Sequence, residues 1–384
     1  MSSEAATPES EEESKSDSST VVYDHEPFET FKARVLELCH QVLGPSKGEI
    51  LIERMHGGGF NRIVGIFVTS SESPTASQYV LRVPRFDAAR LDRDLAPLQL
   101  LRRRSKIKVP EVTAFDTTSH NVLESPYMIQ TRIPGSPLFP AYPDLPYELK
   151  YDIAYELGRV FSELNSIRSV VAGRLTLSPS QGPLRIQPFN NMDPDATVLY
   201  ENGPPAQKPS DMLLALLEYK KELVVAEGPK QSFRVSFFDS FIVVASEMSA
   251  RGLFDDNYYC LCHPDLEPRN ILVSPPSPTQ PQAITGILDW DSALFAPPFM
   301  SCPPPMWLWA WNDEGEEDER LPNMTPPTPD LRELKQLFEY VAGATYLRFA
   351  YGPQYRLARK LMRFAIDGLQ SNEDLKSAEL FLAK

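Results

Sequence analysis

The sequence reads HPDLEPRNILV over residues 263–273 and GILDWD over residues 286–291, and these two segments constrain its fold most. An apolar run follows Asn270 in the first segment, and an apolar run leads to Asp289 in the second. The proline-rich loop PPSPTQPQ separates the two runs. Short apolar runs bounded by such a loop predict the two strands of a β-hairpin. We therefore expect Asn270 and Asp289 to lie at the ends of one hairpin, which fixes their separation.

Three polar residues of the first segment, His263, Asp265 and Asn270, follow the spacing H-x-D-x-x-x-x-N. With a hairpin and a second aspartate after it, this spacing is the layout of a protein-kinase catalytic loop. We predict that Asp265 orients an acceptor hydroxyl and takes its proton, and that His263 holds the loop through hydrogen bonds. Asn270 and Asp289 offer an amide oxygen and a carboxylate, hard ligands of the kind that Mg²⁺ prefers. An alternative is that these are ordinary polar residues of a loop. It is less favoured because the predicted strands around them also match the arrangement in a kinase.

A glycine-rich turn lies in the N-terminal half, where a kinase covers the phosphates of its nucleotide. The turn HGGGFN contains Gly57, Gly58 and Gly59 and lies between two predicted strands. Glycines permit a close approach of the backbone to phosphates and positive φ angles. A plain hairpin turn has the same composition, so this signal alone is weak.

A basic residue, Arg82, lies in the strand-like segment QYVLRVPR that follows the glycine-rich turn. We predict that Arg82 contacts the α- and β-phosphates of the nucleotide. Asp94 lies on the next predicted helix, whereas Glu111 lies past the end of that helix. Asp94 is therefore the better placed partner for Arg82.

Secondary-structure signals predict a β-rich first part of the chain. Apolar residues at helical spacing predict helices over about 27–43 and 86–104. Runs rich in β-branched and aromatic residues predict five strands, at residues 48–55, 62–70, 78–85, 109–118 and 125–133. We expect a five-stranded antiparallel sheet with one helix packed on it. The segment IPGSPL then breaks the secondary structure, as a hinge would.

The second part of the chain is predicted to be mostly helical, with the hairpin described above as the interruption. Its amphipathic or apolar segments predict helices near residues 147–167, 210–227, 236–252, 331–349, 354–369 and 373–382. Cys260 and Cys262 precede the catalytic loop on an expected buried strand, where small buried side chains are their favoured role. Trp307, Trp309 and Trp311 are expected to pack in the core or under a lid.

Taken in order, these motifs resemble the aminoglycoside phosphotransferase and choline kinase-like family of small-molecule kinases, most of all its uncharacterised fungal branch. The matching segments span roughly residues 50–295: GGGFNRI, YVLRVPR, YMIQTRIPGSPL, GRVFSELNSI, CHPDLEPRNILV and ITGILDWDSA. The resemblance implies an α+β, two-lobed, protein-kinase-like fold, with a small antiparallel N-terminal sheet and a mainly helical C-terminal lobe. We expect a nucleotide-binding lobe at 21–133 and, at 134–384, a lobe with the catalytic loop and the acceptor site.

The resemblance also assigns roles to residues of this sequence. It implies Asp265 as the catalytic base, Asn270 and Asp289 as Mg²⁺ ligands, Gly57 to Gly59 as the phosphate loop, Arg82 and Asp94 in place of the usual lysine–glutamate pair, and Gln130 to Ile133 as the hinge beside the adenine. Two departures stand out. Arg82 replaces a lysine, and the two side chains bind phosphate with different geometries. The GDP-containing segment of bacterial relatives is absent, and LFAPPFMSCPPPMWLW stands in its place.

The function implied by the resemblance is ATP- and Mg²⁺-dependent transfer of the γ-phosphoryl group to a hydroxyl of a small molecule. The alternative is a catalytically weak or inactive pseudokinase, a nucleotide-binding module, which the two departures motivate. A protein kinase is less favoured, because the chain has DWD where protein kinases have DFG and shows no APE segment.

Composition narrows the choice of partners. Lysine and arginine total 38 against 52 aspartates and glutamates, a formal net charge of -14. This charge opposes binding to nucleic acids, because such binding depends on neutralising phosphates. It also opposes binding to an anionic membrane surface. A cationic acceptor is one option, since the acidic run at 313–319 would attract it. No obligate protein partner is evident.

The start of the chain predicts where the protein resides. Residues 1–20 carry six acidic residues and one lysine among serines, which predicts a disordered tail with no secretory signal. No apolar run approaches the length of a membrane span. We expect a cytoplasmic protein with reduced cysteines.

Overall fold

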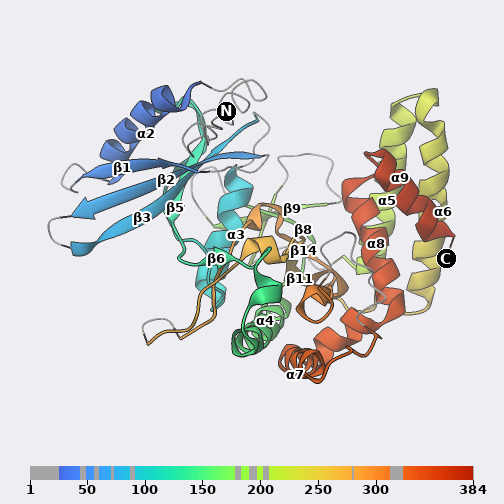
Figure 1. Ribbon diagram of the computed structural model, residues 1–384. Coiled ribbons are helices and arrows are strands. Elements are labelled where there is room, and N and C mark those ends of the chain that lie inside the picture. The colour runs from blue at the N-terminus through green and yellow to red at the C-terminus, as the bar shows by residue number, and fades with distance from the viewer. Residues whose placement is uncertain are drawn as a thin grey trace, which may run out of the picture. The chain divides into compact units, whose positions relative to one another are not determined.

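The protein divides into two compact units, which we describe from a computed structural model (Figure 1). The first unit comprises Met1–Asp92 and Pro110–Arg132, and the second comprises Arg93–Val109 and Ile133–Lys384. The sequence placed residues 93–109 in the first lobe, whereas here they belong to the second unit. The structure describes residues 26–43, 49–55, 60–70, 73–86, 91–177, 183–189, 197–201, 207–278, 281–311 and 323–383. The expected tail at 1–20 and the glycine-rich turn lie outside these residues.

The first unit contains a five-stranded antiparallel sheet, as the sequence predicts. Its strands follow the order β1-β2-β3-β5-β4 (Figure 1). They are β1 (Ile50–Arg54), β2 (Asn61–Ser70), β3 (Ser73–Pro84), β4 (Val112–Asp116) and β5 (Tyr127–Thr131). β2 and β3 are the longest strands and form a nearly continuous ladder from Asn61↔Pro84 to Ser70↔Ser73. β3 begins five residues before the predicted start, because the polar segment from Ser73 to Ser77 extends the ladder with β2.

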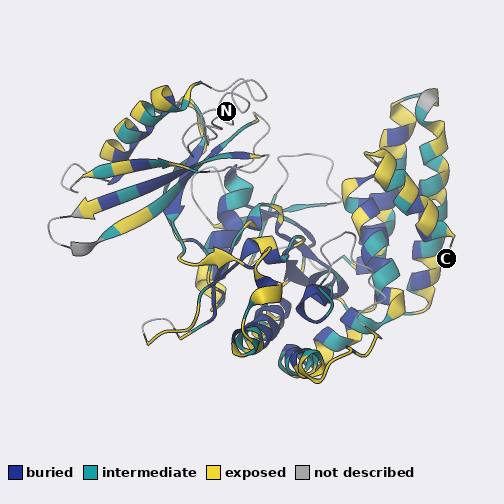
Figure 2. Ribbon diagram, viewed as in Figure 1, coloured by how far each residue is buried: buried dark blue, intermediate teal, exposed yellow. Residues whose placement is uncertain are grey.

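One face of this sheet packs on helix α2 (Phe28–Leu43). Side chains alternate along a strand, so Leu81 and Val83 of β3 point to the same face. Both are buried in one core with Phe31 and Val35 of α2. Buried positions recur along α2 and along the strands of the sheet (Figure 2). Burial of each such side chain contributes about 1.5–3 kcal/mol to the free energy of folding. Arg82, between the two, points to the opposite face of the sheet.

The second unit is rich in helices, in agreement with the sequence. Helix α3 is described from Leu91, since residues 87–90 of its predicted range lie outside the described residues, and the other helices lie within a few residues of their predicted ranges. These helices are α3 (Leu91–Arg104), α4 (Tyr147–Ser166), α5 (Pro209–Ala226), α6 (Ser232–Ala250), α7 (Pro329–Tyr351), α8 (Pro353–Asp367) and α9 (Asn372–Leu382). Aromatic contacts join three of them: Phe241 of α6 stacks on Phe364 of α8 at 5.0 Å and meets Phe381 of α9 edge-on at 5.7 Å.

The predicted hairpin is present in the second unit. β12 (Ile271–Val273) and β13 (Ile284–Ile287) pair antiparallel. A third strand, β6 (Ser136–Pro137), pairs with the other edge of β12. The segment IPGSPL, expected only to break secondary structure, thus supplies a strand that supports the hairpin.

A six-stranded sheet in the second unit is absent from the prediction. Its order is β10-β9-β8-β14-β11-β7. The strands are β7 (Arg168–Ser169), β8 (Gly173–Leu177), β9 (Leu184–Pro188), β10 (Val198–Leu199), β11 (Tyr259–Cys262) and β14 (Leu294–Ala296). Each has at most five residues, too few to show a periodicity. The buried strand expected for Cys260 and Cys262 is β11, and both side chains are buried there.

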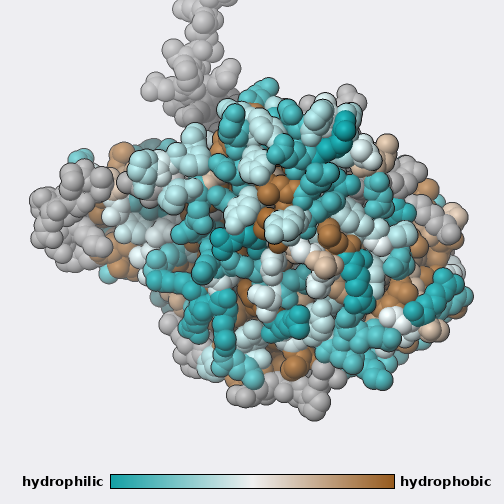
Figure 3. Space-filling model, turned by 90° about the horizontal axis from the view of Figure 1, so that it is seen from below, coloured by the Kyte–Doolittle hydropathy of each residue, from teal (hydrophilic) through white to brown (hydrophobic). Residues whose placement is uncertain are grey.

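The surface is mostly polar on the face shown in Figure 3, where apolar side chains form small separate patches among hydrophilic ones. Trp307 and Trp309 are buried, as expected of packing residues. Within the described residues, no helix combines the length and the apolar character that crossing a membrane requires.

Candidate active site

The hairpin brings Asn270 and Asp289 to the same end of its two strands. Asn270 ends a single 3₁₀ turn, Pro268–Asn270, directly before β12. Asp289 follows β13 by two residues. Ile271 pairs with Ile287, and the Leu288 amide donates to the Asn270 carbonyl at 2.8 Å. The backbone ladder therefore fixes how far apart the two candidate metal ligands lie.

Asp289 has a left-handed backbone conformation, with φ 63° and ψ 51°. Few residues other than glycine adopt this region, although aspartate and asparagine do so more often than most. The next residue, Trp290, starts a 3₁₀ turn and is buried, and its indole Nε1 donates to the Ile287 carbonyl at 3.0 Å. The turn after β13 is thus held at an unusual conformation by a buried ring, and strained backbone of this kind is common at functional sites.

His263 holds the start of the catalytic loop against the end of the hairpin. Its Nε2 donates to the Leu288 carbonyl at 2.8 Å, and its Nδ1 accepts from the Asp265 amide at 3.2 Å. Burial lowers the pKa of His263, and its ring packs edge-on against Trp290 with centroids 4.6 Å apart. The neutral ring therefore acts as a hydrogen-bonding bridge between the two segments.

Two neighbours fix the carboxylate of Asp265. The Asn270 side-chain amide donates to Asp265 Oδ2 at 2.8 Å and to the Asp265 carbonyl at 2.9 Å. Arg269 donates to the other carboxylate oxygen, Oδ1, and forms an ion pair with it. The hydrogen bond that Arg269 donates to Asp265 and the negative charges of Asp265, Glu267 and Asp289 raise the pKa of Arg269.

Arg269 is a site residue that sequence reasoning missed. It lies four residues after Asp265 and directly before Asn270, in the middle of the quoted motif. The segment between the two residues is not α-helical, so their spacing gave no signal, and the fold of the loop brings their side chains together.

The donor set at the hairpin fits a magnesium ion. Among the described residues, no three His, Cys, Asp or Glu side chains gather into a group that could hold a metal on their own. Magnesium typically binds through one or two carboxylates, waters and substrate phosphates rather than an all-protein cage. The amide nitrogen of Asn270 donates to Asp265, which leaves the amide oxygen available as a ligand. Asn270 and Asp289 would hold the ion, which would supply positive charge to a phosphate chain.

In the first unit, Arg82 and Gln130 lie on the sheet face opposite to α2. Val80 pairs with Gln130, and Arg82 pairs with Met128 on β5. Side chains two residues apart on a strand share a face, and so do directly paired residues. The Gln130 side chain is 6% exposed, and no described residue donates to its Oε1. This buried acceptor is suited to a donor group from a ligand, because an unpaired buried polar atom is costly.

The other predicted site residues are those of the hinge, Asp94 and the three glycines. Ile133 packs against Gly286 of β13, where an added Cβ would lie 2.4 Å from the Ile133 side chain. The backbone amides of Thr131 and Arg132, in the predicted hinge, donate to Glu111 and Gln78 within the sheet. Asp94 lies in the first turn of α3, in the second unit, so its pairing with Arg82 stays a prediction. Gly57, Gly58 and Gly59 lie outside the described residues.

Comparison with known proteins assigns the chain to a family. Residues 66–320 match the phosphotransferase enzyme family, APH, over more than half of the chain. The chain therefore belongs to this family of phosphotransferases, and it has the family's protein-kinase-like fold.

The relatives themselves are distant. The chain is 23% identical over 312 residues to a subtelomeric hrmA-associated cluster protein of Aspergillus fumigatus, covering 65% of this chain and 58% of that protein. A second strain of Aspergillus fumigatus has a protein of the same description with the same identity and coverage. The chain thus spans just over half the length of these relatives.

Solved structures support the fold. A candidate aminoglycoside phosphotransferase from Ralstonia eutropha has a TM-score of 0.50 and 14% identity, covering 92% of this chain and 95% of that chain. At this identity the likeness shows the fold alone. A thermostable mutant of aminoglycoside phosphotransferase APH(4)-Ia, solved with ADP and hygromycin B, has 17% identity and a TM-score of 0.45, covering 90% of this chain and 95% of that chain.

Proposed function

We propose that the protein is a small-molecule kinase that transfers the γ-phosphoryl group of ATP to a hydroxyl group in a Mg²⁺-dependent reaction. The observation that carries the proposal is the hydrogen-bonded unit of His263, Asp265, Asn270 and the turn at Asp289. Family membership supports it, because the family consists of phosphotransferases.

The chain's own residues perform the proton transfer. The acceptor hydroxyl oxygen forms a bond to the γ-phosphorus while the bond to the β–γ bridging oxygen breaks. ADP leaves with the electron pair of that bond, and the hydroxyl proton passes to the Asp265 carboxylate. Arg269 and Asn270 hold this carboxylate in one orientation, so little reorganisation is needed as the proton moves.

Each unit contains residues that the resemblance assigns to the nucleotide. Asn270 and Asp289 would hold the Mg²⁺ on the phosphates, and Arg82 would contact the α- and β-phosphates, with Asp94 as its partner. The unpaired Oε1 of Gln130 would accept a hydrogen bond from the adenine amino group, near the predicted hinge. ADP bound to APH(4)-Ia is compatible with this assignment.

The alternative is a pseudokinase that binds the nucleotide without transferring phosphate. Arg82 in the place of the family lysine is the observation that favours it, because arginine and lysine grip phosphate differently. The intact arrangement of Asp265, Asn270 and Asp289 favours the kinase.

The test is phosphate transfer from labelled ATP to a panel of hydroxyl-bearing metabolites. Wild type should phosphorylate an acceptor, and Asp265→Asn should lose roughly 10²–10⁴-fold in rate, because a general base contributes about that much. The control is Asp239→Asn, an exposed residue of α6 that pairs with Lys221, and it should match wild type. ATP binding without transfer to any acceptor would favour the pseudokinase.

A further inference from the structure

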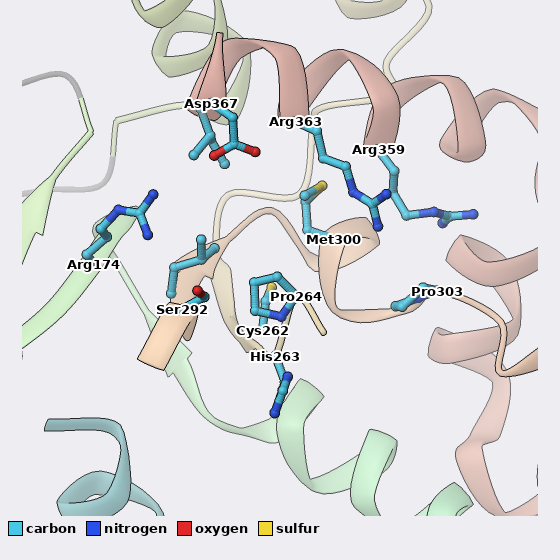
Figure 4. A pocket seen from close by; sticks show the side chains of 12 residues that line it. Arg174, Cys262, His263, Pro264, Ser292, Met300, Pro303, Arg359, Arg363 and Asp367 are labelled. Atoms are coloured by element: carbon cyan, nitrogen blue, oxygen red, sulfur yellow. The ribbon is translucent and has the colours of Figure 1, made fainter. Parts of the chain in front are cut away.

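A cavity of about 170 Å³ borders the catalytic loop within the second unit. His263 and Pro264, which directly precede Asp265, line it together with Ser292 from the turn after Asp289. The remaining walls come from β8, from β11 and β14, and from α8 (Figure 4). Its volume is below that of pockets that enclose drug-sized ligands, so it suits one compact group.

Three arginines line this cavity, against a single acidic residue. Arg174 projects from β8, and Arg359, Arg363 and Asp367 project from α8 (Figure 4). No lysine or glutamate lines it. A compact cavity with this balance of charge favours an anion.

Arg359 has a structural role. It is 2% exposed, and its Nη1 donates to the carbonyl of Phe349 at 2.8 Å and to that of Phe299 at 3.4 Å. It therefore ties α8 to the preceding helix and to the turn beside β14, and it contributes positive charge from a fixed position.

Arg174 and Arg363 are different, because their guanidinium groups are available. Within the described residues, neither guanidinium has a hydrogen bond or an ion pair within 4 Å. Arg174 is half-buried and Arg363 is exposed. Guanidinium groups bind carboxylates and phosphates through paired hydrogen bonds.

Asp367 offsets only part of this charge. Partial burial raises the pKa of its carboxyl, and the charges of Arg174, Lys220 and Arg363 act in the opposite direction. Burial lowers the pKa of Lys220, and the charge of Arg174 lowers it further. Three cations thus act on one carboxylate, and the region keeps an excess of positive charge.

We propose that this cavity binds an anionic group of the acceptor, a carboxylate or a phosphate ester, through Arg174 and Arg363. The inference rests on the proposed function and adds the class of acceptor to it: a small hydroxyl compound that carries negative charge. An anion anchored here would place the rest of the acceptor beside the loop that carries Asp265. The acidic run at 313–319, which suggested a cationic acceptor, lies outside the described residues.

The first experiment measures binding of inorganic phosphate by equilibrium dialysis, with no nucleotide present. Wild type should bind phosphate saturably, and Arg174→Gln and Arg363→Gln should each weaken binding about tenfold, the effect of losing one charge-assisted hydrogen bond. Arg363→Lys should keep part of the affinity. The control is Arg251→Gln, an exposed arginine after α6 that does not line the cavity, and it should bind as wild type does.

Melting temperatures of the variants check that each is folded, and Arg363 is exposed, so its substitution should not unfold the chain. Equal phosphate affinity in wild type and both glutamine variants, or no binding to wild type, would overturn the inference.

The second experiment separates this inference from the proposed function. It compares glycerate, glycerol and choline as acceptors of phosphate from ATP. Phosphate binding that depends on both arginines supports the inference even where no acceptor is phosphorylated. Transfer to glycerol or choline that Arg363→Gln leaves unchanged overturns the inference and leaves the proposed function intact. Transfer to glycerate that Arg363→Gln reduces supports both.

Discussion

At the scale of single residues, Asn270 has two tasks that depend on each other. Its amide nitrogen holds Asp265, and its amide oxygen is the proposed ligand of a cation. The same amide nitrogen also donates a hydrogen bond to the Asp265 carbonyl, so the Asn270 side chain cannot rotate without breaking two hydrogen bonds. One residue therefore couples the orientation of the proposed base to that of the proposed metal ligand.

Asp289 supplies the only full negative charge among the proposed metal ligands. We expect Asp289→Ala to remove the Mg²⁺-dependent part of ATP affinity, because the ion would lose its carboxylate ligand. The measurement is ATP binding by calorimetry with and without Mg²⁺. Asp330→Ala, at the exposed first turn of α7, is the control. Magnesium dependence that survives in Asp289→Ala would contradict the metal assignment.

Substitutions of Arg82 test its proposed contact with the nucleotide phosphates. Arg82→Lys should keep measurable turnover, because the charge remains, while Arg82→Ala should lose on the order of 10²-fold if the phosphates are mispositioned. The measurement is steady-state kinetics with ATP as the varied substrate. Two other nearby arginines are engaged elsewhere: Arg62 donates to the Glu26 carbonyl at 3.1 Å, and Arg85 to the Asn61 carbonyl at 3.2 Å.

Near-wild-type turnover by Arg82→Ala would refute the phosphate contact of Arg82. Lys32→Ala, a surface change on α2, controls for the loss of a positive charge in the same unit.

Sequence reasoning found the motif residues but not their orienting partners. His263, Asp265, Asn270 and Asp289 stand in a spacing that is readable from the chain. The cavity arginines gave no signal, because Arg174 and Arg363 are 189 residues apart. Only the packing of α8 near β8 brings them to one cavity.

At the scale of elements, the segment around Gly135 supports the hairpin that carries the site. Gly135 has φ +110°, and a Cβ there would lie 2.6 Å from the Val273 carbonyl oxygen and 2.7 Å from Thr285 Oγ1. Thr285 in turn donates its hydroxyl hydrogen to the Pro134 carbonyl at 2.5 Å. Glu156 of α4 accepts two hydrogen bonds with its carboxylate, from the backbone amide of Ala283 at 2.9 Å and from that of Ile284 at 2.8 Å. The hairpin is therefore held from both sides.

Gly135→Ala should lower the free energy of unfolding by about 1–3 kcal/mol more than Gly228→Ala. Gly228 also has a positive φ, +97°, but a Cβ there would meet no atom within 4 Å. The comparison therefore isolates the clash with the hairpin from the cost of the backbone conformation. Urea unfolding of the two variants is the measurement, and equal losses would show that the clash is relieved by a small shift.

The sheet of the first unit was predictable because its strands are long enough to show a pattern. β2 and β3 have 10 and 12 residues. The six-stranded sheet of the second unit was not, because β7 and β10 have two residues each and depend on partners far along the chain. Pairing between distant short segments is a tertiary effect that local composition does not encode.

At the scale of the whole molecule, the two units carry different parts of the proposed reaction. The first contains Arg82 and Gln130, and the second contains the catalytic loop, the hairpin and the basic cavity. Each unit has its own core, so the proposed base and metal ligands are held by one unit alone. The family match begins at residue 66, in the first unit, and ends at residue 320, in the second.

The central claim is that Asp265 serves transfer of the γ-phosphoryl group to a small hydroxyl compound. The most direct measurement incubates the protein with an extract of cellular metabolites, Mg²⁺ and ATP labelled with ¹⁸O at the γ-phosphate, and follows the products by mass spectrometry. We predict a metabolite that gains one labelled phosphoryl group with wild type and not with Asp265→Asn. Labelled phosphate that appears only as free phosphate, or a labelled product formed equally by both proteins, would contradict the claim.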